Sequence, residues 1–256
     1  MLWRGTVDRR PPAEHSATGR RGRRQGLSVD VVIATAVEVA DADGLDAVTM
    51  RRVAQALGVV PMTLYTYVPD KAALLDLMLD QLYLTMPRQQ THGQSWRARL
   101  TAVAAENKEF FDRHPWATEV SRSRPPLGPG LMAKYEHELR AFDGTGLDEV
   151  TTDAALTFLL GFVQSSARAA ADARKAIEHS AQTDAQWWAA NGPRLAVYLD
   201  PAAYPTAARV GPVAGEALQS AFNPDHAYEF GLQRVLDGLA VLIQSRAATS
   251  SRRAEP

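Results

Sequence analysis

Apolar residues recur three and four positions apart in successive segments of the chain from residue 28 onwards. This spacing is typical of amphipathic helices, and a residue suited to capping a helix precedes several of the segments. Such capping residues stand at Ser28, Thr49, Asp70 and Ser95. The pattern therefore predicts an all-α protein.

The stretch from Thr49 to Lys71 predicts two short helices joined by a tight turn. Apolar residues fall at helical spacing on both sides of Gly58, whose permissive backbone suits a turn. Pro61 suits the first turn of the second helix, and Pro69 ends that helix. We expect the second helix to run for about two turns, from Met62 to Tyr67.

Further helices are predicted in the second half of the chain. One begins after Ser95, and a long one over residues 147–178 has apolar residues on so many faces that it must be buried on more than one side. A shorter helix is expected over 183–199. Residues 200–215 are rich in Pro, Gly and Ala, which predicts a loop or flexible segment. A final helix begins with Pro224 at its first position.

The final helix carries an apolar seam with alternating spacings of four and three residues. Gly231 and Gly238 flank the seam seven residues apart, which suits close packing against another helix. That other helix belongs either to the same protomer or to a second copy of the chain. The seam consists of Tyr228, Leu232, Val235, Leu239 and Leu242.

The motif TMRRVAQALGVVPMTLYTYVPDK resembles the helix-turn-helix of the TetR family of transcriptional repressors, and the resemblance covers Leu27 to about Thr85. The segment FGLQRVLDGLAVLI, from Phe230 to Ile243, resembles the last dimerisation helix of the tetracycline-repressor branch. The resemblance implies a DNA-binding domain of three or four helices at 27–87, with its motif at about 49–68. It also implies a helical ligand-binding and dimerisation domain at 95–246, and it places the seam in a homodimer interface.

The formal net charge of the 256 residues is only −1, but the charge is unevenly distributed. Residues 1–26 hold seven arginines against one aspartate and one glutamate, which predicts a disordered basic arm. Such an arm either follows DNA phosphates or is a leader without a binding role. Residues 247–256 are expected to form a disordered tail.

The composition limits where the protein works. The chain has no cysteine, so it forms no disulfide or thiolate metal site. No apolar run approaches the roughly 20 residues of a membrane span, and the N-terminus lacks the apolar core of a secretory signal. We expect a soluble, cytoplasmic protein without membrane contact.

Exposed positions of the motif supply the DNA-binding candidates. Thr63 can reach a base edge or a phosphate, and Pro61 or Met62 can contact a thymine methyl group. By the resemblance, Arg51 occupies a position at which an arginine reads guanine, whereas Arg52 is either a DNA contact or a solvated surface charge. The residues predicted to contact DNA are Thr49, Arg51, Arg52, Pro61, Met62, Thr63, Tyr65, Thr66, Tyr67 and Lys71.

The second domain carries a few polar residues on otherwise apolar helices, which is typical of an apolar pocket with orienting groups. Its aromatic residues at helical spacing either line such a pocket or belong to the core. His114 and His137 stand alone, without a carboxylate or histidine partner at metal-ligand spacing, so we predict no metal site and no cofactor. The residues predicted to contact a ligand are Asn107, Phe110, Trp116, Tyr135, Phe158, Phe162, Gln164 and Arg168.

The leading hypothesis is a homodimeric repressor that binds a palindromic double-stranded DNA operator and is released by a small apolar or aromatic molecule. One alternative is a DNA-binding regulator whose C-terminal half serves only for dimerisation or for docking another protein. An activator is a further alternative. An all-helical enzyme is disfavoured, because the chain lacks the G-x-S-x-G, H-E-x-x-H, phosphate-loop and G-x-G-x-x-G motifs and has no cysteine nucleophile.

Overall fold

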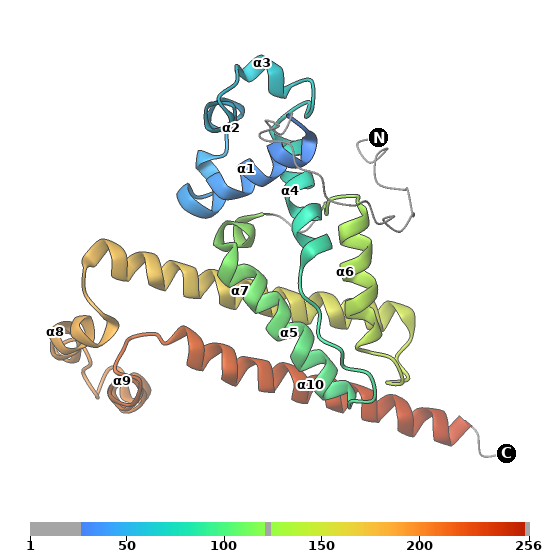
Figure 1. Ribbon diagram of the computed structural model, residues 1–256. Coiled ribbons are helices and arrows are strands. Elements are labelled where there is room, and N and C mark those ends of the chain that lie inside the picture. The colour runs from blue at the N-terminus through green and yellow to red at the C-terminus, as the bar shows by residue number, and fades with distance from the viewer. Residues whose placement is uncertain (1–26, 121–123, 254–256) are drawn as a thin grey trace. The chain divides into compact units, whose positions relative to one another are not determined.

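The computed structural model of the chain describes residues 27–120 and 124–253 (Figure 1). All regular elements in these ranges are helical, which confirms the prediction of an all-α protein. The chain divides into two compact units. Of the described residues, the first unit contains 27–86, 120 and 124–136, and the second contains 87–119 and 137–253. The predicted basic arm lies outside the described residues.

The first unit contains a small helical bundle in which α1 packs against both α2 and α4. Ser28 caps α1 by accepting a hydrogen bond from the Val31 N–H, and Asp70 caps α4 in the same way from Ala73. The fully buried side chains of this unit include Val53, Leu64 and Leu74, one from each of three helices. Its elements are α1 (Val29–Asp43), η1 (Leu45–Ala47), α2 (Met50–Leu57), α3 (Pro61–Leu64) and α4 (Lys71–Thr85).

The start of α6 (Pro129–Arg140) belongs to the first unit and is capped by a side chain of α4. Asp80, only 1% exposed, accepts hydrogen bonds from the backbone N–H groups of Gly130 (3.1 Å) and Leu131 (2.8 Å). The approach is close, since a Cβ added at Gly130 would lie 1.9 Å from the Asp80 carbonyl oxygen. A buried carboxylate therefore holds the first turn of α6 against α4.

The second unit is organised around the 32-residue helix α7. This helix packs against α5, η2 and α10, while α8 packs against α9 (Figure 1). The core of the unit includes Leu100, Leu159 and Leu236, which are fully buried. Its elements are α5 (Trp96–Arg113), η2 (Pro115–Glu119), the end of α6, α7 (Glu149–Ser180), α8 (Asp184–Ala196), α9 (Pro205–Leu218) and α10 (Pro224–Arg253).

The predicted loop over residues 200–215 is wrong, because α9 occupies most of it. Pro205 begins this helix, where a missing N–H costs nothing, and the alanines of the segment favour helix. These preferences and packing against α8 outweigh the cost of Gly211 and Pro212 within the helix. Composition alone overstated the effect of the Pro and Gly residues.

The last helix is also longer than predicted. α10 continues to Arg253, so the expectation of a disordered tail from residue 247 is wrong for residues 247–253, whereas 254–256 lie outside the described residues. No Gly or Pro follows Gly238 before the helix ends, so nothing in the sequence interrupts it. In the described ranges, no helix combines the length and apolarity needed to cross a membrane.

Candidate functional site

The helix-turn-helix is built by local hydrogen bonds around α2 and α3. Thr49 caps α2 by accepting a hydrogen bond from the Arg52 N–H at 3.1 Å. Gly58 ends α2 in the left-handed region (φ 68°), where glycine carries no steric penalty. Val60 is extended and Pro61 then begins α3. The sequence predicted the roles of Thr49, Gly58 and Pro61, because capping is a local effect.

The second helix of the motif is shorter than predicted. Its regular part, α3, ends at Leu64, whereas we expected helix as far as Tyr67. The Thr66 and Tyr67 N–H groups instead donate to carbonyls three residues back, and the Thr66 hydroxyl also donates to the Thr63 carbonyl at 2.7 Å. These backbone bonds to the third residue back replace the helical pattern of bonds to the fourth, so the segment continues as turns.

The residues predicted to contact DNA lie on the surface of α2, α3 and the start of α4. Met62 is the most exposed of the large apolar side chains on this face, at 73%, while Leu64 and Val68 are fully buried. Thr63 and Tyr67 are partly exposed. The exposed residues of the predicted set are Thr49, Arg51, Arg52, Pro61, Met62, Tyr65, Thr66 and Lys71.

The structure distinguishes two adjacent arginines of α2. The Arg52 guanidinium lies 3.1 Å from the carboxylate of Asp43 at the end of α1. Arg51 is exposed and forms no ion pair with any described residue. An exposed ion pair contributes little stability, but it does orient the Arg52 side chain toward α1. Arg51 is therefore the arginine of α2 that is available to an external partner.

A buried polar cluster lies between α5 and the end of α6 in the second unit. The Asn107 side-chain nitrogen donates to Glu138 Oε1 at 2.7 Å, and both residues are buried. The neighbouring Glu106 accepts the Gln89 N–H at 2.6 Å and lies 2.8 Å from His137 Nε2. Burial of two carboxylates is tolerated because each has hydrogen-bond partners.

The interpretation of His137 as an isolated histidine is wrong, since it pairs with Glu106. The two residues are 31 positions apart, so no local spacing pattern could have joined them. The available signal was weak, since Glu106 and Asn107 begin a run of four polar residues in the sequence. Among the described residues, no group of three or more His, Asp or Glu side chains is placed to hold a metal ion.

Four of the residues predicted to contact a ligand gather around α5, η2 and α7. Phe110 and Trp116 are buried on either side of His114, with ring centroids 5.5 Å and 6.3 Å from the His114 ring. The Gln164 side chain donates to the Thr118 carbonyl at 3.0 Å. Asn107 lies on α5 one turn before Phe110, and its amide is bonded to Glu138.

The other predicted ligand residues do not join this region. Phe158 and Arg168 are exposed on α7, and Phe162 stacks on Tyr228 of α10 with 5.8 Å between ring centroids. Tyr135 belongs to the first unit. The sequence could not separate these positions, because helical spacing assigns residues to faces without saying what covers each face.

The predicted dimer seam of α10 faces the core of its own protomer. Leu232, Val235 and Leu239 are buried within a single chain, so they are not available to a second copy. A heptad seam describes close helix packing of any origin, and here α7 and α5 provide the partner surface. The exposed apolar side chains of these long helices are elsewhere: Val150 and Phe158 on α7, and Phe230 and Val241 on α10.

An exposed helix-turn-helix in one compact unit and an all-helical second unit define a helix-turn-helix transcriptional regulator. The model of the bacterial regulatory proteins of the tetR family matches residues 32–78. The model of the tetracyclin repressor-like C-terminal domain matches residues 87–243. The chain therefore belongs to the TetR family of DNA-binding transcriptional regulators.

Individual relatives resemble most of the chain. The transcriptional repressor DrrR1 of Streptomyces coeruleorubidus is 39% identical over 239 residues, which span 91% of this chain and 86% of the relative. The class C tetracycline repressor of Escherichia coli is 27% identical over 222 residues, covering 83% and 90%. The solved structure of ActR from Streptomyces coelicolor with (S)-DNPA superimposes with a TM-score of 0.66 at 25% identity, covering 84% and 98%.

Proposed function

We propose that the protein is a homodimeric repressor that binds a palindromic operator and leaves it when a mostly apolar or aromatic molecule binds the second unit. The observation that carries this proposal is the exposed face of α2 and α3, on which Arg51 forms no ion pair within residues 27–120 and 124–253. The 39% identity to a protein named as a transcriptional repressor supports the sign of regulation.

The DNA contacts follow from the exposed side chains. Arg51 would read a guanine edge, and Met62 and Thr63 would contact bases in the major groove. Tyr65 and Lys71 would hold phosphates and set the register without reading sequence. Because α3 has only four residues, one protomer presents few base contacts. Two copies with recognition helices about 34–36 Å apart would read two half-sites.

The second copy would pack on the exposed apolar faces of α7 and α10. On α7, Val150, Ala154, Phe158 and Gly161 follow one another at spacings of four, four and three residues, and all are exposed. A Cβ added at Gly161 or at Gly238 of α10 would meet nothing within 4 Å. Exposed apolar faces with small residues suit close helix packing, so this surface replaces the predicted seam as the dimer interface.

The effector would bind among Asn107, Phe110, Trp116 and Gln164. This region combines buried aromatic rings with two side-chain amides, which matches an apolar molecule carrying a few polar groups. ActR, which is similar along its whole length, has been solved with (S)-DNPA, and this supports a small-molecule effector here. A coupling of about 1–3 kcal/mol would change operator affinity by roughly 5- to 150-fold.

Fluorescence anisotropy on the intergenic DNA beside the protein's own gene tests the proposal. We expect saturable binding that salt weakens steeply, and a loss of about 1–3 kcal/mol in Arg51→Ala because a base contact disappears. Arg113→Ala is the matched control, since Arg113 is an exposed arginine of the second unit paired with Glu109. Adding (S)-DNPA to the protein–DNA complex while following the anisotropy tests whether the compound releases the protein from the DNA.

Two results would contradict the proposal in different ways. Equal affinity for the intergenic and a scrambled DNA, unaffected by Arg51→Ala, would show that this face does not read an operator. Specific DNA binding that neither (S)-DNPA nor other aromatic compounds weaken would leave the second unit as a dimerisation or docking module. Transcription assays with the same DNA would separate a repressor from an activator.

A further inference from the structure

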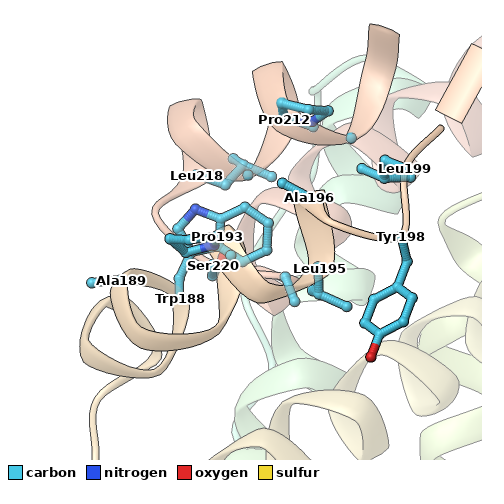
Figure 2. Close-up of a pocket in the computed structure, with 15 residues that line it drawn as sticks. Trp188, Ala189, Pro193, Leu195, Ala196, Tyr198, Leu199, Pro212, Leu218 and Ser220 are labelled. Carbon is cyan, nitrogen blue, oxygen red and sulfur yellow. The ribbon is translucent and has the colours of Figure 1, made fainter. Parts of the chain in front are cut away.

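An apolar pocket opens between α8 and α9 (Figure 2). Its volume is about 700 Å³, within the range of drug-sized ligand sites. None of the ligand-contacting residues predicted from the sequence lines it. Its walls come from α8, the connection that follows, α9 and the residues directly after α9, with Trp188, Pro193, Leu199, Pro212 and Leu218 among the lining residues.

Glycines allow Trp188 to form one wall of this pocket. A Cβ added at Gly215 of α9 would lie 1.9 Å from the Trp188 ring, so no other residue fits there without displacing the indole. Gly192 of α8 is also close, with an added Cβ 3.2 Å from the same ring. The indole is therefore held between the two helices, and its position does not depend on a flexible surface rotamer.

The lining of the pocket includes a buried hydroxyl group that has no hydrogen-bond partner among the described residues. Ser220 lines the pocket and is only 4% exposed. Among the described residues, its hydroxyl has no hydrogen-bond partner. The other lining hydroxyl, that of Tyr198, belongs to an exposed side chain and points away from the other labelled side chains in Figure 2. A buried hydroxyl normally finds a partner, because leaving it unpaired is costly.

We propose that the pocket between α8 and α9 binds an apolar ring compound whose hydroxyl or carbonyl group pairs with Ser220. The indole of Trp188 and the rings of Pro193 and Pro212 offer flat apolar surfaces to the rings of the compound. Ser220 supplies a buried orienting group of the kind that an otherwise apolar pocket uses for specificity. All lining residues lie within 188–221 of the second unit, so the site stands whether or not the protein binds an operator.

Titration calorimetry with 1-naphthol and naphthalene on the full-length protein tests the site. The two probes differ by one hydroxyl group, and Ser220→Ala removes its proposed partner. We expect the wild-type protein to bind 1-naphthol about fivefold more tightly than naphthalene, and Ser220→Ala to abolish this preference while leaving naphthalene binding unchanged. The melting temperature of Ser220→Ala should not fall, because the hydroxyl makes no hydrogen bond within the described residues.

Gly211→Leu is the filling control. Gly211 lines the pocket, and an added Cβ would meet only Leu199 at an ordinary 3.9 Å, so a larger side chain there extends into the pocket without a clash at its base. Both probes should lose binding in this variant while its helical circular dichroism is retained. Binding that survives Gly211→Leu, or a naphthol preference that survives Ser220→Ala, would overturn the proposal.

The pocket could instead be covered by a second copy of the chain. In that case neither probe would bind the wild-type protein, and sedimentation velocity would show that Gly211→Leu weakens self-association. This result also overturns the proposal, and it would assign the surface of α8 and α9 to an interface.

Discussion

Tyr228 shows how the surroundings of one side chain change its chemistry. Burial, with a smaller contribution from the negative charge of Asp112, raises the pKa of Tyr228 to about 12. Phe162 stacks on the ring, and the ammonium of Lys108 lies 5.6 Å from its centroid. The phenol is thus kept neutral between α7 and α10, in a position that the sequence assigned to a dimer interface.

This raised pKa predicts how stability depends on alkaline pH. Below about pH 10 the phenol is neutral in both states, so its contribution is fully present. Between pH 10 and 12 the unfolded chain loses the proton first, so the free energy of unfolding falls. After discounting for the partial exposure of the ring, we expect a loss on the order of 1–2 kcal/mol.

Urea unfolding of the wild-type protein and Tyr228→Phe at pH 8 and pH 11.5 measures this effect. Tyr228→Phe has no proton to lose at that position, so its midpoint should fall less than that of the wild type between the two values. Identical pH responses would mean that the phenol is solvated in the folded protein.

At the level of elements, the contact between α4 and the first turn of α6 depends on one side chain. Asp80 accepts two backbone N–H groups of α6, and Gly128 and Gly130 leave room for it. An added Cβ at Gly128 would lie 2.3 Å from the Asp80 carboxylate carbon. Asp80 of α4 and Gly130 in the first turn of α6 are 50 residues apart in the chain.

Removing this carboxylate should destabilise the protein. Asp80→Ala leaves two N–H groups without their acceptor in a buried setting, and we expect a cost of about 1–3 kcal/mol in the free energy of unfolding. Asp76→Ala, which removes an exposed carboxylate from the same helix, is the control. Urea midpoints that are equal for the two variants would show that Asp80 does not support the end of α6.

At the level of the whole molecule, α7 and α10 each carry an exposed apolar face in addition to the face that packs in the core. Phe158 of α7 and Val241 of α10 are 61% and 68% exposed, although they lie on the two helices that build the core of the second unit. Each helix therefore buries one face within its protomer and leaves another apolar face open. For this reason the dimer interface that we propose lies on surfaces that the heptad pattern did not indicate.

Charges placed on this surface should weaken both self-association and DNA binding. Phe158→Asp and Val241→Asp should raise the monomer fraction in sedimentation velocity, because a buried unpaired charge opposes the interface. Operator affinity should then fall by at least about tenfold, since one protomer reads only one half-site. Ala105→Asp, an exposed position on α5, should change neither. Unchanged sedimentation of both aspartate variants would place the interface elsewhere.

Local features of the site could be predicted and distant pairings could not. Thr49 and Gly58 were assigned their roles correctly, because a helix cap and a left-handed turn depend on neighbours within a few residues. The pairing of Glu106 with His137 was missed, because the residues meet only after α5 and α6 pack. The short length of α3 was missed because the Thr66 and Tyr67 N–H groups bond three residues back, and apolar periodicity does not distinguish such turns from regular helix.

The sequence by itself determined the all-α class, the helix-turn-helix and the family, because periodicity, caps and motif residues act over short stretches of chain. Only the tertiary structure decided which apolar face of α10 is core, which arginine of α2 forms no ion pair with the described residues, and that a pocket lies between α8 and α9. The physical reason is that the burial of an apolar side chain depends on what covers the helix face on which it lies, and not on its residue type. An apolar face has the same pattern whether its own chain, a second copy or a ligand covers it.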